Sequence, residues 1–330
     1  MPRKLIVAAL AVAALAAAAA QAQTASTGSG PAYPAKPIQM IVPVQAGSGA
    51  DAILRIVANK MAENMKQQIV LDNAPGAAGL IAMERAARAP TDGYTIAGVN
   101  DGSLVMTPHL YKKVNYDPLN SFDPVSLIAQ INWVMIINPS MQVKSVKDFI
   151  ALAKARPGQI DYASGGNGSP QHIAMEVFAA RTGTKLNHVP YRGATQAALD
   201  VVGGQIPCMF TATSIVLGNI RDGKVRALGV GSAKRSALLP DVPTIAEAGV
   251  PGFEYFTWAG IFVPKGTPKA IIDKLNAEAV KAVNDSSTRD RLRESALDPV
   301  GSTADELGKI TRESYERMGN LIRKIGLQPQ

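Results

Sequence analysis

The feature that most restricts the fold of this chain is a regular alternation between short apolar runs rich in β-branched residues and longer amphipathic segments. Eight such runs occur, at residues 38–44, 68–73, 94–100, 133–138, 160–164, 186–191, 207–212 and 225–230. Strand-like runs that alternate with helical patterns are typical of α/β proteins with mostly parallel sheets and helices on both faces. The sequence therefore predicts an α/β fold.

The amphipathic segments carry helix boundary signals. After Asp51, apolar residues recur at three- and four-residue intervals, as in one face of a helix. Ser145 is a cap candidate for a helix that stops at residues 157–158, Pro-Gly. Thr303 and Glu306 form a capping-box pattern ahead of a last amphipathic segment, which we assign to packing.

A chain of 330 residues favours two domains. We expect the chain to pass from one domain to the other at the apolar stretches at residues 127–130 and 256–263. The sequence between these stretches contains a complete run of strand and helix patterns. We therefore predict that residues 33–130 and 257–330 form domain 1, and that residues 131–256 form a second domain inserted into it.

The first residues have the pattern of a secretory signal peptide. Arg3 and Lys4 precede an apolar stretch that is too short for a membrane span, and Ala20-Gln21-Ala22 is a small-x-small cleavage site. We predict a signal peptide at residues 1–22, cleaved after Ala22, and a flexible leader at residues 23–32. The mature chain is then expected to be periplasmic.

The charge and cysteine content limit the partners. Without Arg3 and Lys4, 32 of the 34 basic residues remain against 26 acidic ones, a balance of +6 that is scattered along the chain. No basic cluster favours nucleic-acid binding, whereas a mildly basic exported protein suits a small anionic partner. Cys208 is the single cysteine, so no intramolecular disulfide is expected, and its apolar neighbours indicate a buried thiol.

A glycine-containing turn, VPVQAGSGAD at residues 42–51, joins a predicted strand to a predicted helix. Gly47 and Gly49 allow the backbone to approach a ligand closely. The N–H groups of a first helical turn have no partner inside the helix and form an anion site. We assign Asp51 to shaping the loop, because a carboxylate at a helix start usually caps it and would repel an anion if it pointed inward.

A second glycine-rich turn, at residues 165–169, follows the run at 160–164. It ends with Ser169 as N-cap and Pro170 at the first helical position, both of which favour a helix start. Two further strand exits lie at residues 192–195 and 211–214. Strand C-terminal ends line the ligand crevice in open α/β sheets. Any one glycine turn is most simply a chain reversal, but two glycine-rich turns in separate halves of the chain favour a ligand site.

Several side chains near these turns have two interpretations. Arg192 is either a solvated loop cation or the partner of an anion. His172 falls in the first turn of the helix after Pro170, but the histidines lack metal-site spacing and no metal is predicted. For Trp133 and Trp258 core or hinge packing is favoured, with an aromatic wall for a ring-shaped ligand as the alternative.

Enzyme motifs are weak. Residues 47–52 match G-x-G-x-x-A and Asp72 follows about twenty residues later, the spacing of a dinucleotide-dependent oxidoreductase, which is our alternative function. Three features oppose this alternative. Residues 44–46 make the turn after the strand longer than a dinucleotide-binding turn, Asp51 would bring negative charge toward a pyrophosphate, and the signal peptide removes the protein from cytosolic cofactor pools. Ser169 and His172 do not form a triad without an orienting acid, and no P-loop, G-x-S-x-G or H-E-x-x-H is present. We predict binding without catalysis and no cofactor.

Taken in order, the motifs resemble those of the periplasmic solute receptors of tripartite tricarboxylate transporters, the Bug-type receptors. The resemblance runs from Tyr33 to the C-terminus and is carried by YPAKPI, VPVQAGSGAD, NAPGAAG, PTDGYT, YDPLNSFDPVSLIA, NPS, ARPGQIDYASGGNGSPQH, VPYRG, GKVRALGVGSAKRSALLPDVPTIAEAGVPG and VPKGTP. It implies a two-lobed periplasmic-binding-protein (Venus flytrap) fold that closes on a small solute and delivers it to a separate membrane permease.

The resemblance also implies that backbone amides and ordered waters at the two glycine turns hold a ligand carboxylate. With the strand exits, it gives the candidate ligand-binding set Ala46, Gly47, Ser48, Gly49, Ala50, Ser103, Gly165, Gly166, Asn167, Gly168, Ser169, His172, Arg192, Gly193, Ala194 and Thr211.

Four departures from the family pattern bear on the ligand: Gln45 where Pro is frequent, Ser48 for Gly, Ala74 for Arg, and Thr211 where Asp often occurs. A neutral Thr211 removes a partner for an ammonium group. The ligand is therefore expected to be a plain carboxylate, with a dicarboxylate or an aromatic acid as the two forms considered, and the receptor is expected to be a monomer.

Overall fold

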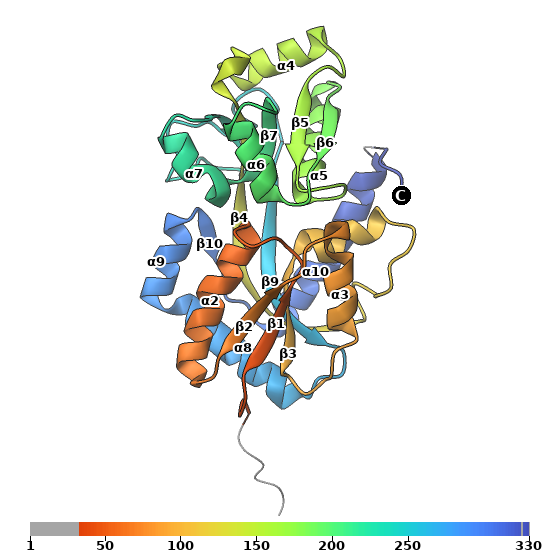
Figure 1. Ribbon diagram of the computed structural model, residues 1–330, viewed down its shortest axis with the longest axis vertical. Helices are drawn as coiled ribbons and strands as arrows, with labels where there is room; N and C mark the ends of the chain where they lie inside the picture. The colour runs from red at the N-terminus through yellow and green to blue at the C-terminus, as the bar shows by residue number, and fades with distance from the viewer. Residues whose placement is uncertain (1–32, 325, 330) are drawn as a thin grey trace, which may run out of the picture. The chain divides into compact units, whose positions relative to one another are not determined.

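The computed structural model describes residues 33–324 and 326–329, and Figure 1 shows how their elements are arranged. The predicted signal peptide and leader, residues 1–32, lie outside these described residues. Residues 36–330 group into one compact unit by their internal contacts.

The first lobe is built on parallel strands. β1 (Ile38–Val42) pairs in parallel with β2 (Ile69–Asn73) and with β3 (Thr95–Asn100). The connections are helices α2 (Gly49–Met65) and α3 (Leu80–Ala87). The apolar face predicted after Asp51 is buried in α2, because its residues pack onto the sheet.

Two long strands connect the lobes. The first half of β4 (Phe122–Ile137) pairs antiparallel with β9 (Phe256–Pro264), and its second half pairs antiparallel with strands of the second lobe. In Figure 1 both strands run from the lower group of elements to the upper one. The stretch predicted at residues 127–130 and the run at 133–138 belong to the same strand, β4.

The second lobe repeats the strand–helix alternation. Its strands are β5 (Asp161–Ser164), β6 (Asn187–Pro190), β7 (Cys208–Ala212) and β8 (Arg226–Val230). Its helices are α4 (Val146–Ala155), α5 (Pro170–Thr182), α6 (Ala194–Val202) and α7 (Thr213–Arg221). β5 pairs in parallel with β6 and β7, whereas β7 and β8 pair antiparallel with β4.

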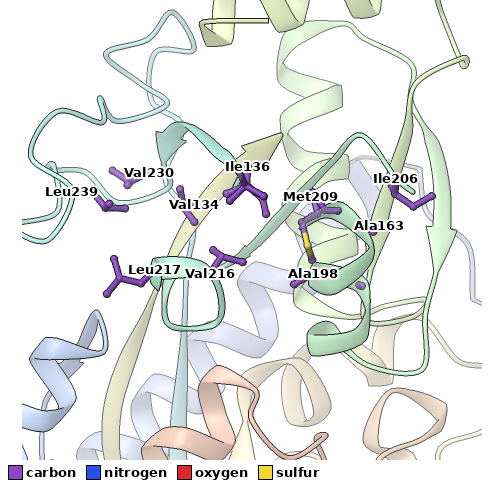
Figure 2. Packing of buried hydrophobic residues seen from close by; sticks show 13 residues of the cluster. Val134, Ile136, Ala163, Ala198, Ile206, Met209, Val216, Leu217, Val230 and Leu239 are labelled. Atoms are coloured by element: carbon purple, nitrogen blue, oxygen red, sulfur yellow. The ribbon is translucent and has the colours of Figure 1, made fainter. Parts of the chain in front are cut away.

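The core of the second lobe lies between this sheet and helices α6 and α7 (Figure 2). Val134 and Ile136 from β4 and Met209 from β7 meet Val216 from α7, and all four side chains are fully buried. Burying an aliphatic side chain contributes about 1.5–3 kcal/mol. This cluster therefore holds the N-terminal ends of α6 and α7 at fixed positions above the sheet.

The chain then returns to the first lobe. The remaining strand and helices are α8 (Lys269–Asn284), α9 (Ser286–Glu294), β10 (Leu297–Pro299) and α10 (Ala304–Lys324), and the short helical turns are η1 (Ala77–Gly79), η2 (Gly102–Met106), η3 (Thr107–His109) and η4 (Pro139–Met141). The capping box before α10 is formed, since Glu306 N–H donates to Thr303 Oγ1 at 3.2 Å and Thr303 N–H donates to Glu306 Oε2 at 2.9 Å. β10, a three-residue strand that the sequence did not reveal, pairs with β4.

The two-lobed α/β fold class is thus confirmed. The prediction of mostly parallel sheets is corrected: the sheet is mixed, because parallel pairs lie at its outer strands and antiparallel pairs lie along β4 and β9. The antiparallel pairing of β4 with β9 follows from the inserted lobe, because β4 leaves the first lobe and β9 returns to it in the opposite direction.

Among the helices of residues 33–324, none is both long and apolar enough to cross a membrane.

Candidate functional site

A cleft of about 650 Å³ lies where strand ends of both lobes meet. The exits of β1 and β3 approach it from the first lobe, and the exits of β5, β6 and β7 approach it from the second. Of the candidate ligand-binding residues, twelve line this cleft: Ser48, Gly49, Ala50, Ser103, Gly165, Gly166, Asn167, Gly168, Ser169, Arg192, Gly193 and Ala194. Turns far apart in the sequence are therefore brought around one cavity.

Asp51 stabilises the first glycine turn, residues 42–51, through hydrogen bonds to its carboxylate. Its carboxylate accepts hydrogen bonds from Gly47 N–H, Arg55 Nη2 and Asn73 Nδ2, each at 2.9 Å. Burial by itself raises the pKa of Asp51, but these hydrogen bonds outweigh burial and hold the pKa below its ordinary value. Asp51 is directed into the turn, as expected for a residue that shapes the loop, and it does not line the cleft.

The start of α2 presents backbone N–H groups beside the cleft. Ser48 caps the helix by accepting from Asp51 N–H at 3.3 Å. Gly47, in the left-handed region at φ 79°, lets the chain enter the helix. The N–H groups of Gly49 and Ala50 then stand at the positive end of α2 beside the cleft, which favours an anion.

The second turn uses several of its own N–H groups internally. Gly166 N–H donates to Ser164 Oγ at 3.1 Å, and Gly168 N–H donates to His172 Nδ1 at 3.0 Å. Ser169 N–H donates to the Gly166 carbonyl at 3.1 Å. The turn is consequently rigid before any ligand binds, but it has fewer free donors than its glycine content suggests.

His172 faces away from the cleft and supports the turn from within the second lobe. Its ring stacks on that of His188, with centroids 4.0 Å apart and an angle of 4°, and Tyr162 stacks next to His188. Burial, followed by the proximity of His188, lowers the pKa of His172 to about 3, and burial lowers the pKa of His188 to about 4. Both rings are therefore neutral at neutral pH, and Nδ1 of His172 is free to accept the Gly168 N–H.

The third and fourth turns begin helices without a side-chain cap. Within the described chain, neither Gly193 before α6 nor Ala212 before α7 places a side chain on the first-turn N–H groups. Arg192 lies next to the start of α6 with an exposed side chain. A helix start and a guanidinium in one place give the cleft a positive end.

Four candidate residues do not line the cleft: Ala46, Gly47, His172 and Thr211. Ala46 is exposed outside it, and the Gly47 N–H is taken by Asp51. Thr211 is fully buried and precedes Ala212, which does line the cleft, so strand alternation directs the two side chains to opposite faces of β7. These four positions therefore lie outside the lining of the cleft.

Sequence reasoning missed other parts of the lining. The turn at residues 75–79 and the residues Ile131, Trp133 and Thr257 on the connecting strands all border the cleft. The turn is visible in the sequence as NAPGAAG, but no anion argument singled it out. The strand residues gave no local signal beyond apolar alternation, although Trp133 had been considered as an aromatic wall.

The lobes touch beside the cleft. A Cβ placed on Gly49 would lie 3.0 Å from Ala212 Cβ and 3.2 Å from Ser214 Oγ, atoms of the opposite lobe. Tyr111 of the first lobe donates to the Asn167 carbonyl of the second at 3.4 Å. The lobes are therefore in contact beside the cleft, and a Cβ at position 49 would require its neighbours to shift by a few tenths of an ångström.

The dinucleotide interpretation does not fit this geometry. Asp72 forms an ion pair with Arg85 and accepts from Gln39 Nε2 at 2.9 Å, so its carboxylate is engaged on the surface of the sheet. It does not line the cleft. Within residues 33–324 and 326–329 there is also no cluster of three histidine, cysteine or acidic side chains suited to a metal ion.

The fold and the site define the class of protein. Two lobes are joined by the long strands β4 and β9, and several helix N-termini lie around the cleft between them, as in a two-lobed solute-binding protein. A family model described as "Tripartite tricarboxylate transporter family receptor" matches residues 53–327. The chain belongs to this receptor family. Receptors of the family bind solutes and are not enzymes, which removes the oxidoreductase alternative.

Relatives and solved structures agree with this assignment. The "UPF0065 protein in tcbD-tcbE intergenic region" of Pseudomonas sp. (strain P51) is 38% identical over 287 residues, which are 87% of this chain and 85% of the relative. Protein BugT of Bordetella pertussis is 33% identical over 291 residues, 88% of this chain and 89% of the relative.

Three structures cover 88–90% of this chain and the whole of their own. The periplasmic binding protein BugD matches with a TM-score of 0.86 and 31% identity. An R. palustris protein solved with adipate matches with a TM-score of 0.88 and 30% identity. MatC from Rhodopseudomonas palustris with bound malate matches with a TM-score of 0.83 and 28% identity.

Proposed function

We propose that this receptor binds a small organic carboxylate in the cleft between its lobes, in the periplasm, and delivers it to a tripartite tricarboxylate-type permease. The observation that carries the proposal is the charge of the cleft. Among the described residues that line it, Arg192 is the only one with a charged side chain, no aspartate or glutamate is present, and the N-terminal ends of α2, α6 and α7 meet there.

Magnitudes support a site that needs both lobes. A micromolar Kd corresponds to about 8 kcal/mol, whereas a charge at one helix N-terminus contributes about 0.3–2 kcal/mol. Charge-assisted hydrogen bonds contribute about 1.5–3 kcal/mol each. One turn is insufficient, so the carboxylate is held jointly by the α2 start from one lobe and by Arg192 and the α6 start from the other.

The relatives support the ligand class. One structural neighbour was solved with adipate and another with malate, and both ligands are carboxylates. The domain limits proposed for closure are residues 33–130 and 257–330 against residues 131–256, because β4 and β9 are the connections between the lobes. Export with cleavage after Ala22, a monomeric receptor and delivery to a permease complete the proposal.

The test is a binding measurement with a matched pair of variants. A thermal-shift and calorimetric panel of mono-, di- and tricarboxylates, amino acids and sugars should give a shift confined to carboxylates, since ligand at a hundredfold over Kd adds about 2.7 kcal/mol. Arg192→Gln should weaken the bound carboxylate about tenfold.

Arg221→Gln is the control, because Arg221 is an exposed cation of the same lobe outside the cleft lining. Equal losses in the two variants would show a general charge effect and place the carboxylate elsewhere. Binding confined to sugars or amino acids would reject the proposed ligand class.

A further inference from the structure

We infer that the ligand is a monocarboxylate with a flat, apolar, aromatic body that lies on the floor of the cleft. The inference rests on the proposed function and narrows its ligand class. Three observations lead to it: the composition of the floor, the fixed orientation of Trp133, and the internal pairing of polar side chains around the cleft.

The floor is formed by three neighbouring strands. Ile131 and Trp133 are two residues apart on β4 and so share one face of the sheet. The register pairs Ile131 with Thr257 of β9, and Trp133 with Ala212 of β7. All four side chains line the cleft and are at most 4% exposed. The ligand body therefore meets a continuous and predominantly apolar surface.

Trp133 cannot offer a hydrogen bond to the ligand. Its Nε1–H donates to Thr257 Oγ1 at 2.8 Å, which fixes the indole and uses one acceptor position of the Thr257 hydroxyl. The ring of Tyr255 packs edge-on against it, with centroids 5.4 Å apart and planes at 87°. An immobile indole held by two neighbours is a preformed surface for another ring, and such ring pairs are favourable beyond the area that they bury.

Two hydroxyl groups along the wall donate within the protein, whereas the Oε1 of Gln45, which also lines the cleft, is buried without a hydrogen-bond partner among the described residues. Ser103 Oγ donates to Asn100 Oδ1 at 2.8 Å, and Tyr191 Oη donates to Asp200 Oδ2 at 2.7 Å. Arg192 is the single charged side chain among the described lining residues. The first carboxylate has Arg192 and the starts of α2 and α6 as partners, but no described lining residue supplies a second cation for another carboxylate over the floor, and burying a carboxylate without a charged partner is unfavourable.

The experiment compares four acids by calorimetry with the mature receptor at pH 7: 4-methylbenzoate, terephthalate, hexanoate and adipate. The first pair differs by exchange of a methyl for a carboxylate on a ring, and the second pair repeats the comparison on a flexible chain. We expect 4-methylbenzoate to bind about tenfold more tightly than each of the other three.

Two substitutions at Trp133 assign the preference to the floor. Trp133→Phe keeps a flat ring and should keep the preference for 4-methylbenzoate over hexanoate. Trp133→Leu should abolish that preference while hexanoate still binds, and bound hexanoate shows that the variant is folded.

The outcomes separate the two proposals. Tighter binding of terephthalate or adipate than of its monocarboxylate partner would overturn the inference and leave the carboxylate receptor intact. An unchanged preference in Trp133→Leu would equally overturn it. Failure of every carboxylate in the wider panel would reject the proposed function itself.

Discussion

Adding a single methyl group at Gly49 should weaken ligand binding without weakening the fold. Gly49 is the first residue of α2 and lies against Ala212 and Ser214 of the second lobe. A Cβ at this position would lie 3.0 Å from Ala212 Cβ, 3.2 Å from Ser214 Oγ and 3.3 Å from Ile131 Cγ2. Favourable carbon contacts begin near 3.5 Å, so Gly49→Ala forces the lobes apart by a few tenths of an ångström.

The magnitude follows from the cost of overpacking, about 1–3 kcal/mol for an added methylene in a packed site. Two of the three contacted atoms belong to the second lobe, so this cost is borne mainly by the closed form. A penalty of this size on closure reduces affinity about 5- to 150-fold. An arrangement with the lobes farther apart would lack these contacts, so we expect the penalty to fall on closure rather than on folding.

The assay is calorimetry with the best carboxylate, combined with urea unfolding in the absence of ligand. Gly218→Ala is the matched control: it makes the same substitution on α7, where no heavy atom lies within 4 Å of the added carbon. The control should bind normally and gain about 0.5–1 kcal/mol in unfolding free energy. A Kd for Gly49→Ala within twofold of the parent would show that the bound form does not make this contact, and the closure argument would be refuted.

Two further predictions concern the supports of the turns. The pKa of His188 is about 4 in the folded protein and about 6.5 in the unfolded chain. The contribution of this histidine to stability is therefore complete above pH 6.5 and is lost as the pH falls toward 4. In urea unfolding at pH 7, 6 and 5, His188→Gln should reduce the dependence of unfolding free energy on pH by up to about 1.4 kcal/mol per unit; an unchanged slope would contradict the neutral, buried ring. Asp51→Ala should free the Gly47 N–H and the Arg55 guanidinium, and so should weaken carboxylate binding about tenfold or more through disorder of the turn. Arg55→Ala is its control, with a smaller loss because the other hydrogen bonds to Asp51 persist.

Local signals in the sequence were sufficient for most of the elements. Each of the eight predicted apolar runs contains a strand or part of one, Ser145 caps α4 by accepting from Asp148 N–H, and Ser169 with Pro170 begins α5. These features depend on hydrogen bonds between residues three or four apart, or on the alternation of a single strand. For the same reason β10 was missed: three residues carry too little pattern, and the strand exists because β4 offers it a partner.

The candidate site divides in the same way. The sequence by itself determined that glycine turns follow strands and open helices, that Asp51 shapes the first turn, and that an anion is favoured there. Only the tertiary structure decided three other features. His172 accepts a hydrogen bond from the second turn, and the Thr211 side chain lies on the face of β7 opposite the cleft. Trp133 and Thr257 share the floor of the cleft. The physical reason is that burial and neighbours across a sheet depend on contacts that no local sequence pattern encodes, such as the 2.8 Å hydrogen bond from Trp133 to Thr257, which lie on different strands.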